Sequence, residues 1–258
     1  MILILSLLGR RVLWALTNLG DFGILMIDVI RHLPRVRVYW ALMIKQMIEI
    51  GIRSMPIVLI IAFFAGLVTA VQTGYQFQGY VPAYLVGSIV LESVVLELAP
   101  VLGGLVLSGR VGATIAAELG TMRVTEQIDA YEVMAMNPIV YLAIPRILAG
   151  MFMLPVLVIF ADLIGVLSGM VAALDRMEVS IPDFERGMRE FFRTKDAFFG
   201  LTKSFFFGIT ITTIACYQGF KVKPGSGAEG VGKATTNTVV VSCIVILLLD
   251  YLLARTIL

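Results

Sequence analysis

The sequence has few charged side chains, one histidine and two cysteines, and each shortage excludes a class of protein. Charged residues make up 15% of the 258 residues and hydrophobic residues 59%, whereas soluble domains are about 25% charged and roughly 45–50% apolar. This composition excludes a disordered, fibrous or ordinary cytosolic protein. His32 is the lone histidine, and Cys216 and Cys243 lie in apolar runs, which argues against a metal cluster or a disulfide framework.

The long apolar runs indicate an integral membrane protein. No charged residue lies between Arg53 and Glu92, and a helix needs about 20 mainly apolar residues to cross a bilayer. Such segments must be helical because an open strand edge leaves backbone groups unsatisfied in lipid. The five predicted spans lie near Pro56–Gly74, Tyr84–Ser108, Ile139–Leu174, Ala197–Phe220 and Thr236–Ile257. The fold class is therefore an all-α integral membrane protein with five transmembrane helices.

The first 47 residues differ from these runs because charged side chains interrupt their apolar stretches. This pattern is typical of an amphipathic helix on the membrane surface, with Trp14 and Trp40 suited to the interface. A short first span is the alternative. We therefore divide the chain into an interfacial region, 1–47, and a transmembrane domain, 48–258.

The distribution of basic residues predicts a cytoplasmic N-terminus. Seven Lys and Arg residues lie in residues 1–53, and none lies in the first predicted loop, 75–83. Basic residues favour the cytoplasmic side. Alternation of the spans then puts the five basic residues of 175–196 outside, which runs against the rule.

The segment Gly227–Ala234 resembles a phosphate-binding P-loop but departs from it in two ways. Ala234 stands where the metal-binding Ser or Thr of a P-loop follows its Lys. The preceding residues also belong to a membrane span rather than to a buried strand. We expect no nucleotide site here, and the glycines are suited to a sharp turn before the last span.

A polar segment, 109–138, separates the second and third predicted spans. It is rich in helix formers, with Gly120 dividing it and Pro138 ending it. An apolar stripe and a mainly acidic stripe run along it: Val124, Ile128, Tyr131 and Ala135, and Glu118, Thr125, Asp129 and Glu132. The pattern suits a cytoplasmic helix that docks on a soluble partner; a solvated connector on the membrane is the alternative.

Charged residues inside the spans are the other candidates for function. They are Glu92, Glu97, Asp162, Lys203 and Asp250. Charges at membrane depth are costly and face a partner or a cavity more often than lipid. Glu97 and Lys203 are either a structural ion pair or part of a pathway for an amphiphile with a charged head. No intramembrane protease motif is present, so the chain is not expected to be an enzyme.

Three stretches of the sequence form a recognisable set. They are Glu97–Leu102 (ELAPVL), Gly109–Ala113 followed by Ala116–Ala130 (GRVGA and AAELGTMRVTEQIDA), and Gly227–Thr236 (GAEGVGKATT). Together they strongly resemble the MlaE-type permease family, the membrane subunits of bacterial ABC transporters for phospholipids and related lipids. The similarity runs from about residue 40 to the end of the chain.

The resemblance implies an architecture and a set of partners. It implies an N-terminal elbow helix, five spans and a cytoplasmic coupling helix at about 113–137. It implies a homodimer paired with a cytoplasmic ABC ATPase, an MCE-domain periplasmic protein and, in some systems, a STAS-domain protein. ATP and magnesium would then bind to the ATPase, with no cofactor on this chain and no nucleic acid among its partners.

The resemblance also implies roles for particular residues. Glu97, Lys203 and Gln72 would lie near the head group of a phospholipid in the central cavity. Contact with the ATPase would come from Glu118, Met122, Arg123, Thr125, Glu126, Gln127 and Asp129. The implied function is lipid transport between the bacterial inner membrane and an MCE channel, which maintains outer-membrane lipid asymmetry. A secondary transporter that works without an ATPase is the alternative.

Overall fold

Every regular element in the part of the chain that the structure describes is a helix. The computed structural model describes all residues except 1, 35, 78–81, 83, 177–178 and 258. The helices are α1 (Ile2–His32), α2 (Val36–Ile50), η1 (Ile52–Ser54), α3 (Met55–Phe77), α4 (Leu85–Ser93), η2 (Val94–Leu98), α5 (Ala99–Leu107), η3 (Ser108–Gly112), α6 (Ala113–Val124), α7 (Gln127–Val133), η4 (Ile139–Ala143), α8 (Ile144–Arg176), α9 (Ile181–Phe191), α10 (Thr194–Phe220) and α11 (Gly227–Ile257).

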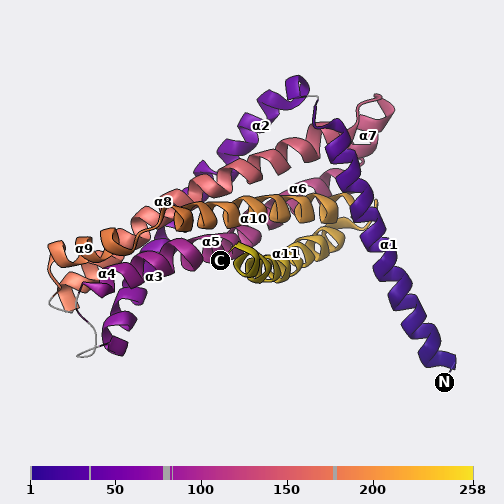
Figure 1. The fold of residues 1–258 in the computed structure, drawn as a ribbon. Coiled ribbons are helices and arrows are strands. Elements are labelled where there is room, and N and C mark those ends of the chain that lie inside the picture. The colour runs from indigo at the N-terminus through magenta and orange to yellow at the C-terminus, as the bar shows by residue number, and fades with distance from the viewer. Residues whose placement is uncertain (1, 35, 78–81, 83, 177–178, 258) are drawn as a thin grey trace.

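Five continuous helical runs among the described residues are long and apolar enough to cross a membrane, which confirms the predicted fold class. They are Tyr39–Phe77, Leu85–Val124, Ile139–Asp175, Thr194–Phe220 and Gly227–Ile257. Several exceed the predicted spans because helix continues past the apolar stretch into polar sequence. In Figure 1 the long helices α8 and α10 run side by side and α11 lies obliquely to them, while α7 and α9 mark opposite ends of the bundle.

The N-terminal region forms two helices that differ in direction. α1 crosses the α7 end of the bundle at a steep angle, whereas α2 leads into the first span (Figure 1). The chain turns at Leu33 and Pro34, and the Tyr39 hydroxyl donates a hydrogen bond to the Leu33 carbonyl. A second tyrosine, Tyr217 of α10, holds α1 by donating to the Asn18 carbonyl at 3.1 Å.

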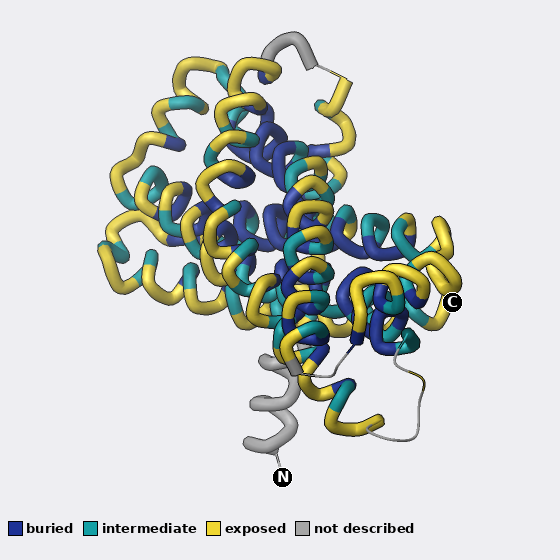
Figure 2. Tube along the Cα trace, turned by 90° about the vertical axis from the view of Figure 1, so that its left-hand side faces the viewer, coloured by how far each residue is buried: buried dark blue, intermediate teal, exposed yellow. Residues whose placement is uncertain are grey.

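Small residues let the spans pack closely in the centre of the bundle. A Cβ atom at Gly66 of α3 would lie 1.9 Å from the Gly165 carbonyl oxygen of α8. A Cβ atom at Gly208 of α10 would lie 2.4 Å from the Gly150 oxygen. Such approaches are typical of helix pairs in membranes. Buried residues follow these crossings, while the outer faces of the helices stay exposed (Figure 2).

The glycine segment after α10 is not a P-loop. Gly227 to Ala234 form the first turns of α11, so their backbone N–H groups cannot form a phosphate-binding loop. Gly225 and Gly227 have φ angles of 76° and 61°, which are values that glycine adopts without strain. The predicted role in a sharp turn is therefore confirmed for Gly227, whereas Gly230 and Gly232 lie inside α11.

Candidate functional site

Three spans bring charged side chains together around Lys203, which is fully buried in α10. Its ammonium lies 2.5 Å from Glu97 Oε1 of η2 and 2.8 Å from Asp250 Oδ1 of α11. The contact with Asp250 is an ion pair without hydrogen-bond geometry. The ammonium also lies 4.6 Å from the centroid of the Phe199 ring. We call Lys203, Glu97 and Asp250 the charged cluster.

The backbone next to Glu97 explains how this lysine is held. Pro100 has no N–H and cannot donate to the Leu96 carbonyl four residues earlier. The helix widens into a π-helical turn at Val94–Leu98, a feature often found at functional sites. Lys203 Nζ donates to the Leu96 carbonyl at 3.1 Å, so a carbonyl that Pro100 cannot use becomes an additional ligand for a buried charge.

The two carboxylates of the charged cluster differ in access to solvent. The side chain of Glu97 is 46% exposed, whereas that of Asp250 is 20% exposed. Two carboxylates facing one ammonium leave an excess negative charge in the spans, and a buried charge must be paired to be tolerated. Asp250 would therefore keep Lys203 compensated if Glu97 left the pair.

Gln72 and Asp162 lie outside this cluster. Gln72 is exposed on α3, and no hydrogen bond among the described residues joins it to Glu97 or Lys203. Asp162 of α8 has a buried Oδ1 with no hydrogen-bond partner in the described part of the chain. The sequence singled out Asp250 only as an intramembrane charge; its pairing with Lys203 depends on how α10 and α11 pack.

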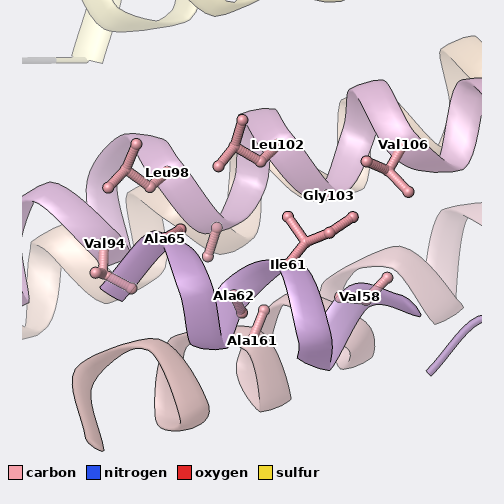
Figure 3. A pocket seen from close by; sticks show the side chains of 11 residues that line it. Val58, Ile61, Ala62, Ala65, Val94, Leu98, Leu102, Gly103, Val106 and Ala161 are labelled. Atoms are coloured by element: carbon pink, nitrogen blue, oxygen red, sulfur yellow. The ribbon is translucent and has the colours of Figure 1, made fainter. Parts of the chain in front are cut away.

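An apolar groove runs between α3, the second span and α8. Figure 3 shows Ile61 of α3 facing Leu98 and Leu102 across it. Alanine and glycine line much of the rest, including Ala62, Ala65, Ala99, Gly103 and Ala161. The enclosed volume is about 10 Å³, roughly that of one water molecule. The groove must widen before it can hold an acyl chain.

The expected helix at about 113–137 is two helices instead of one. α6 continues the second span to Val124, and α7 begins at Gln127 after Glu126, whose φ is 59°. Gly120 does not divide the segment as expected: it is buried within α6, and a Cβ atom there would lie 3.1 Å from Val222 Cγ2. Its lack of a side chain serves close packing with the turn after α10.

The predicted ATPase-contact residues have different surroundings in the structure. Thr125, Glu126 and Gln127 are exposed at the break between α6 and α7. Arg123 forms an ion pair with Asp129 that ties α7 to α6. Met122 is partly buried and packs against the hydrophobic core.

The remaining member of that set, Glu118, faces inward to a buried arginine. Its Oε2 lies 2.9 Å from Nη2 of Arg146, whose side chain is 8% exposed. Arg146 also donates to the Leu142 carbonyl at 2.7 Å, while its Nε finds no hydrogen-bond partner among the residues that the structure describes. Glu118 therefore compensates a buried charge within the chain.

The apolar residues at the end of α7 were missed by the sequence pattern. Ile128 of the predicted apolar stripe is 2% exposed and packs in the core. Val133 and Met134 instead are 88% and 60% exposed. The apolar stripe assumed helix from Val124 to Ala135 without interruption, and the break at Glu126 changes which residues share a face. The end of α7 thus presents two apolar side chains beside exposed polar ones.

The chain is similar to a family of bacterial permeases. The profile of the family described as Permease MlaE matches residues 43–256. A "Probable ABC transporter permease protein" of Rickettsia bellii is 38% identical over 248 residues, covering 96% of this chain and 95% of that protein. The "Intermembrane phospholipid transport system permease protein MlaE" of Haemophilus influenzae is 33% identical over 250 residues, 96% of this chain and 95% of its own.

A plant protein is also similar. "Protein TRIGALACTOSYLDIACYLGLYCEROL 1, chloroplastic" of Arabidopsis thaliana is 30% identical over 227 residues, which are 88% of this chain and 64% of the plant protein.

Proposed function

The chain belongs to the MlaE permease family, and from this premise we propose that it is the membrane subunit of an ATP-driven phospholipid transporter. It moves phospholipids between the bacterial inner membrane and a channel formed by an MCE-domain protein, and so maintains outer-membrane lipid asymmetry. The observation that carries the proposal is a charged cluster with one accessible carboxylate at membrane depth, in a chain similar to a phospholipid permease.

The permease is a non-catalytic, multi-pass membrane component, so the energy for transport must come from a partner. We place ATP and magnesium on a cytoplasmic ABC ATPase, in line with the relatives that are named ABC transporter permeases. The proposed contact with this ATPase is the segment from Thr125 to Met134, whose two ends are exposed. Its apolar end, Val133 and Met134, has the exposed anchors that docking on a groove requires.

The remaining assembly follows from the same premise. We propose a homodimer because α11 has a large apolar surface that its own chain does not cover. Only 17% of the most apolar stretch of α11 is buried, compared with 56% for α10. Its exposed side chains include Val240, Ile244, Leu247 and Tyr251. The MCE-domain protein would dock at the α9 end, and a STAS-domain protein could bind the ATPase. The N-terminus and α7 lie at the cytoplasmic end.

The proposed cycle links the ATPase-contact segment, Thr125 to Met134, to the lipid site at Glu97. ATP binding closes the ATPase subunits, and the contact segment transmits the movement to the second span through α6. The groove beside Leu98 and Leu102 changes width, and a phospholipid passes with its head group near Glu97. The drive is the difference in affinity of the ATPase for the two conformations of the permease.

The test is reconstitution together with the native partners. The tagged chain is purified from its own membrane in mild detergent, co-purifying proteins are identified by mass spectrometry, and the assembly is placed in vesicles that contain fluorescent phospholipid. We expect an ABC ATPase and an MCE-domain protein to co-purify and lipid transfer to require ATP. Recovery of the chain alone, with transfer that needs no ATP, would instead establish the secondary transporter.

A further inference from the structure

A polar cavity, separate from both the charged cluster and the apolar groove, lies between α2 and the end of the second span. Its volume is about 210 Å³. It is lined by Gln46, Glu49 and Ile50 from α2 and by Arg110, Val111, Thr114, Ile115 and Glu118 from η3 and α6. The residues proposed above for the head group during transport, Glu97, Lys203 and Gln72, are not part of its lining.

Arg110 provides this cavity with a cation that has no carboxylate partner among the described residues. Its Nε donates to Ser54 Oγ at 3.1 Å, and no other hydrogen bond of its guanidinium is formed within the described part of the chain. A guanidinium has five N–H donors, so most of them face the cavity or solvent. Planar pairs of such donors match the oxygens of a phosphate group.

The cavity also holds two carboxylates, each with one cationic partner outside the lining. Glu49 Oε2 lies 2.7 Å from Arg53, and Glu118 Oε2 lies 2.9 Å from Arg146. An ionised carboxylate accepts about four hydrogen bonds, so both can accept more. A purely anionic ligand would meet one cation and two anions here, whereas a ligand with both charges would find a partner for each.

The depth of the cavity suits a lipid head group. Arg110 is the first charged residue after Glu97 along the second span, and thirteen residues of helix put it about 20 Å further along the axis. It marks the end of the apolar part of this span, where arginine side chains reach the head groups.

We propose that this cavity binds the head group of a phospholipid that carries both a phosphate and a primary ammonium, as phosphatidylethanolamine does. The phosphate lies on Arg110, and the ammonium lies between Glu49 and Glu118. The site is separate from the transport pathway, and it holds a lipid between α2 and the second span. A soluble phosphate ester with an ammonium group has the same chemistry, and the experiment separates the two sources.

Photo-cross-linking of the full-length chain in vesicles tests the site. Benzoylphenylalanine replaces Gln46, and intact-mass spectrometry measures the yield of lipid adduct in phosphatidylethanolamine and in phosphatidylglycerol vesicles. We expect about a tenfold higher yield with phosphatidylethanolamine and about a tenfold loss of that yield in Arg110→Gln. The control is Lys45→Gln. Lys45 lies on α2 and is exposed, but it does not line the cavity, so we expect this variant to leave the yield unchanged.

A second variant and a competition experiment test the site independently of whether Arg110→Gln folds. Glu49→Gln retains Arg110 and its contact with Ser54, so it tests the site if Arg110→Gln fails to fold; we expect it to remove most of the preference for phosphatidylethanolamine. Equal yields in the folded Arg110→Gln variant and the parent would show only annular lipid and overturn the proposal. Loss of the adduct on addition of millimolar O-phosphoethanolamine would overturn the lipid in favour of the soluble ester. Neither outcome depends on transport or on the ATPase.

Discussion

Two buried cations of the membrane domain, Lys203 and Arg146, each pair with a half-exposed glutamate, but their surroundings differ. Lys203 has Asp250 as a second carboxylate, together with the Leu96 carbonyl. Arg146 has only Glu118 as a carboxylate partner among the described residues, and its Nε is unsatisfied. Glu97 can therefore leave its pair without exposing an uncompensated charge, whereas Glu118 cannot. We therefore expect Glu97 to be available to a ligand in the transport pathway, and the pair between Glu118 and Arg146 to contribute to stability.

Replacing Lys203 has the largest expected effect. Lys203→Met removes the cation between Glu97 and Asp250 and leaves two carboxylates in the spans without compensation. We expect lipid transfer to fall more than about tenfold and the melting temperature in detergent to drop. Lys203→Arg keeps the charge and should retain part of the stability. Unchanged transfer in Lys203→Met would show that the charged cluster has no part in transport.

The stability of two glutamate variants tests the comparison itself. Glu118→Gln should lower the free energy of unfolding by about 1–3 kcal/mol, less than the roughly 3–5 kcal/mol of a fully buried pair because Glu118 is half-exposed. Glu97→Gln should cost under about 1 kcal/mol because Asp250 still faces Lys203. Thermal unfolding in detergent measures both. A greater loss in Glu97→Gln would reverse the assignment.

Transport should rank the same two variants in the opposite order. Per folded molecule, Glu97→Gln is expected to reduce ATP-dependent lipid transfer about tenfold, since the accessible charge is gone. Glu118→Gln should transfer lipid at a rate within about twofold of the parent, because its partner Arg146 lies outside the charged cluster. The measurement is the rate in vesicles, normalised to folded protein by gel filtration.

Changes on the surface of α7 should weaken binding of the ATPase and leave the stability of the permease nearly unchanged. Replacing both Val133 and Met134 by Ser removes exposed apolar contacts, and we expect about tenfold weaker retention of the ATPase with an unchanged melting temperature. The control is Thr114→Ala, a surface change on α6 away from α7. Full retention of the ATPase by the double variant would exclude the end of α7 from the contact.

Removing the charge of Glu126 has the smallest expected effect. Glu126→Asn removes the charge but suits the left-handed backbone at this position, where φ is 59°. We expect ATPase binding to persist and the lipid moved per ATP hydrolysed to fall by about twofold. The readout is the ratio of lipid transfer to phosphate release. A ratio equal to that of the parent would exclude Glu126 from coupling.

The five spans could be predicted from the sequence because their signal is the cost of charge and open backbone in lipid. Glu97 and Lys203 were singled out as intramembrane charges, and the structure shows that they form a pair, which fits both a structural ion pair and a place in a lipid pathway. Asp250 could not be assigned to it because periodicity within α11 says nothing about which span faces it. The short helix α9 was expected only as a loop, although Ser180 caps it and Phe184 is fully buried.

The end of the second span illustrates a different difficulty. Gly120 was expected to divide a helix, because glycine lowers helix propensity. Tertiary contacts override that preference, since a Cβ atom at Gly120 would crowd the Val222 side chain at 3.1 Å. The cavity at Arg110 likewise depends on α2 folding back beside η3, which no local pattern in either segment predicts.

The second span contains two π-helical turns, and each turn rotates the helix that follows it about the span axis relative to the helix before it. Each such turn accommodates one residue more than an α-helical turn, and one residue corresponds to about 100° of rotation. The turn at Val94–Leu98 thus sets the direction of Glu97 relative to α4, and the turn at Ser108–Gly112 sets that of Arg110 relative to α5. A single-residue deletion in either turn would regularise the helix and rotate everything beyond it. The spacing of residues in these turns is therefore as much a determinant of the two polar sites as the side chains themselves.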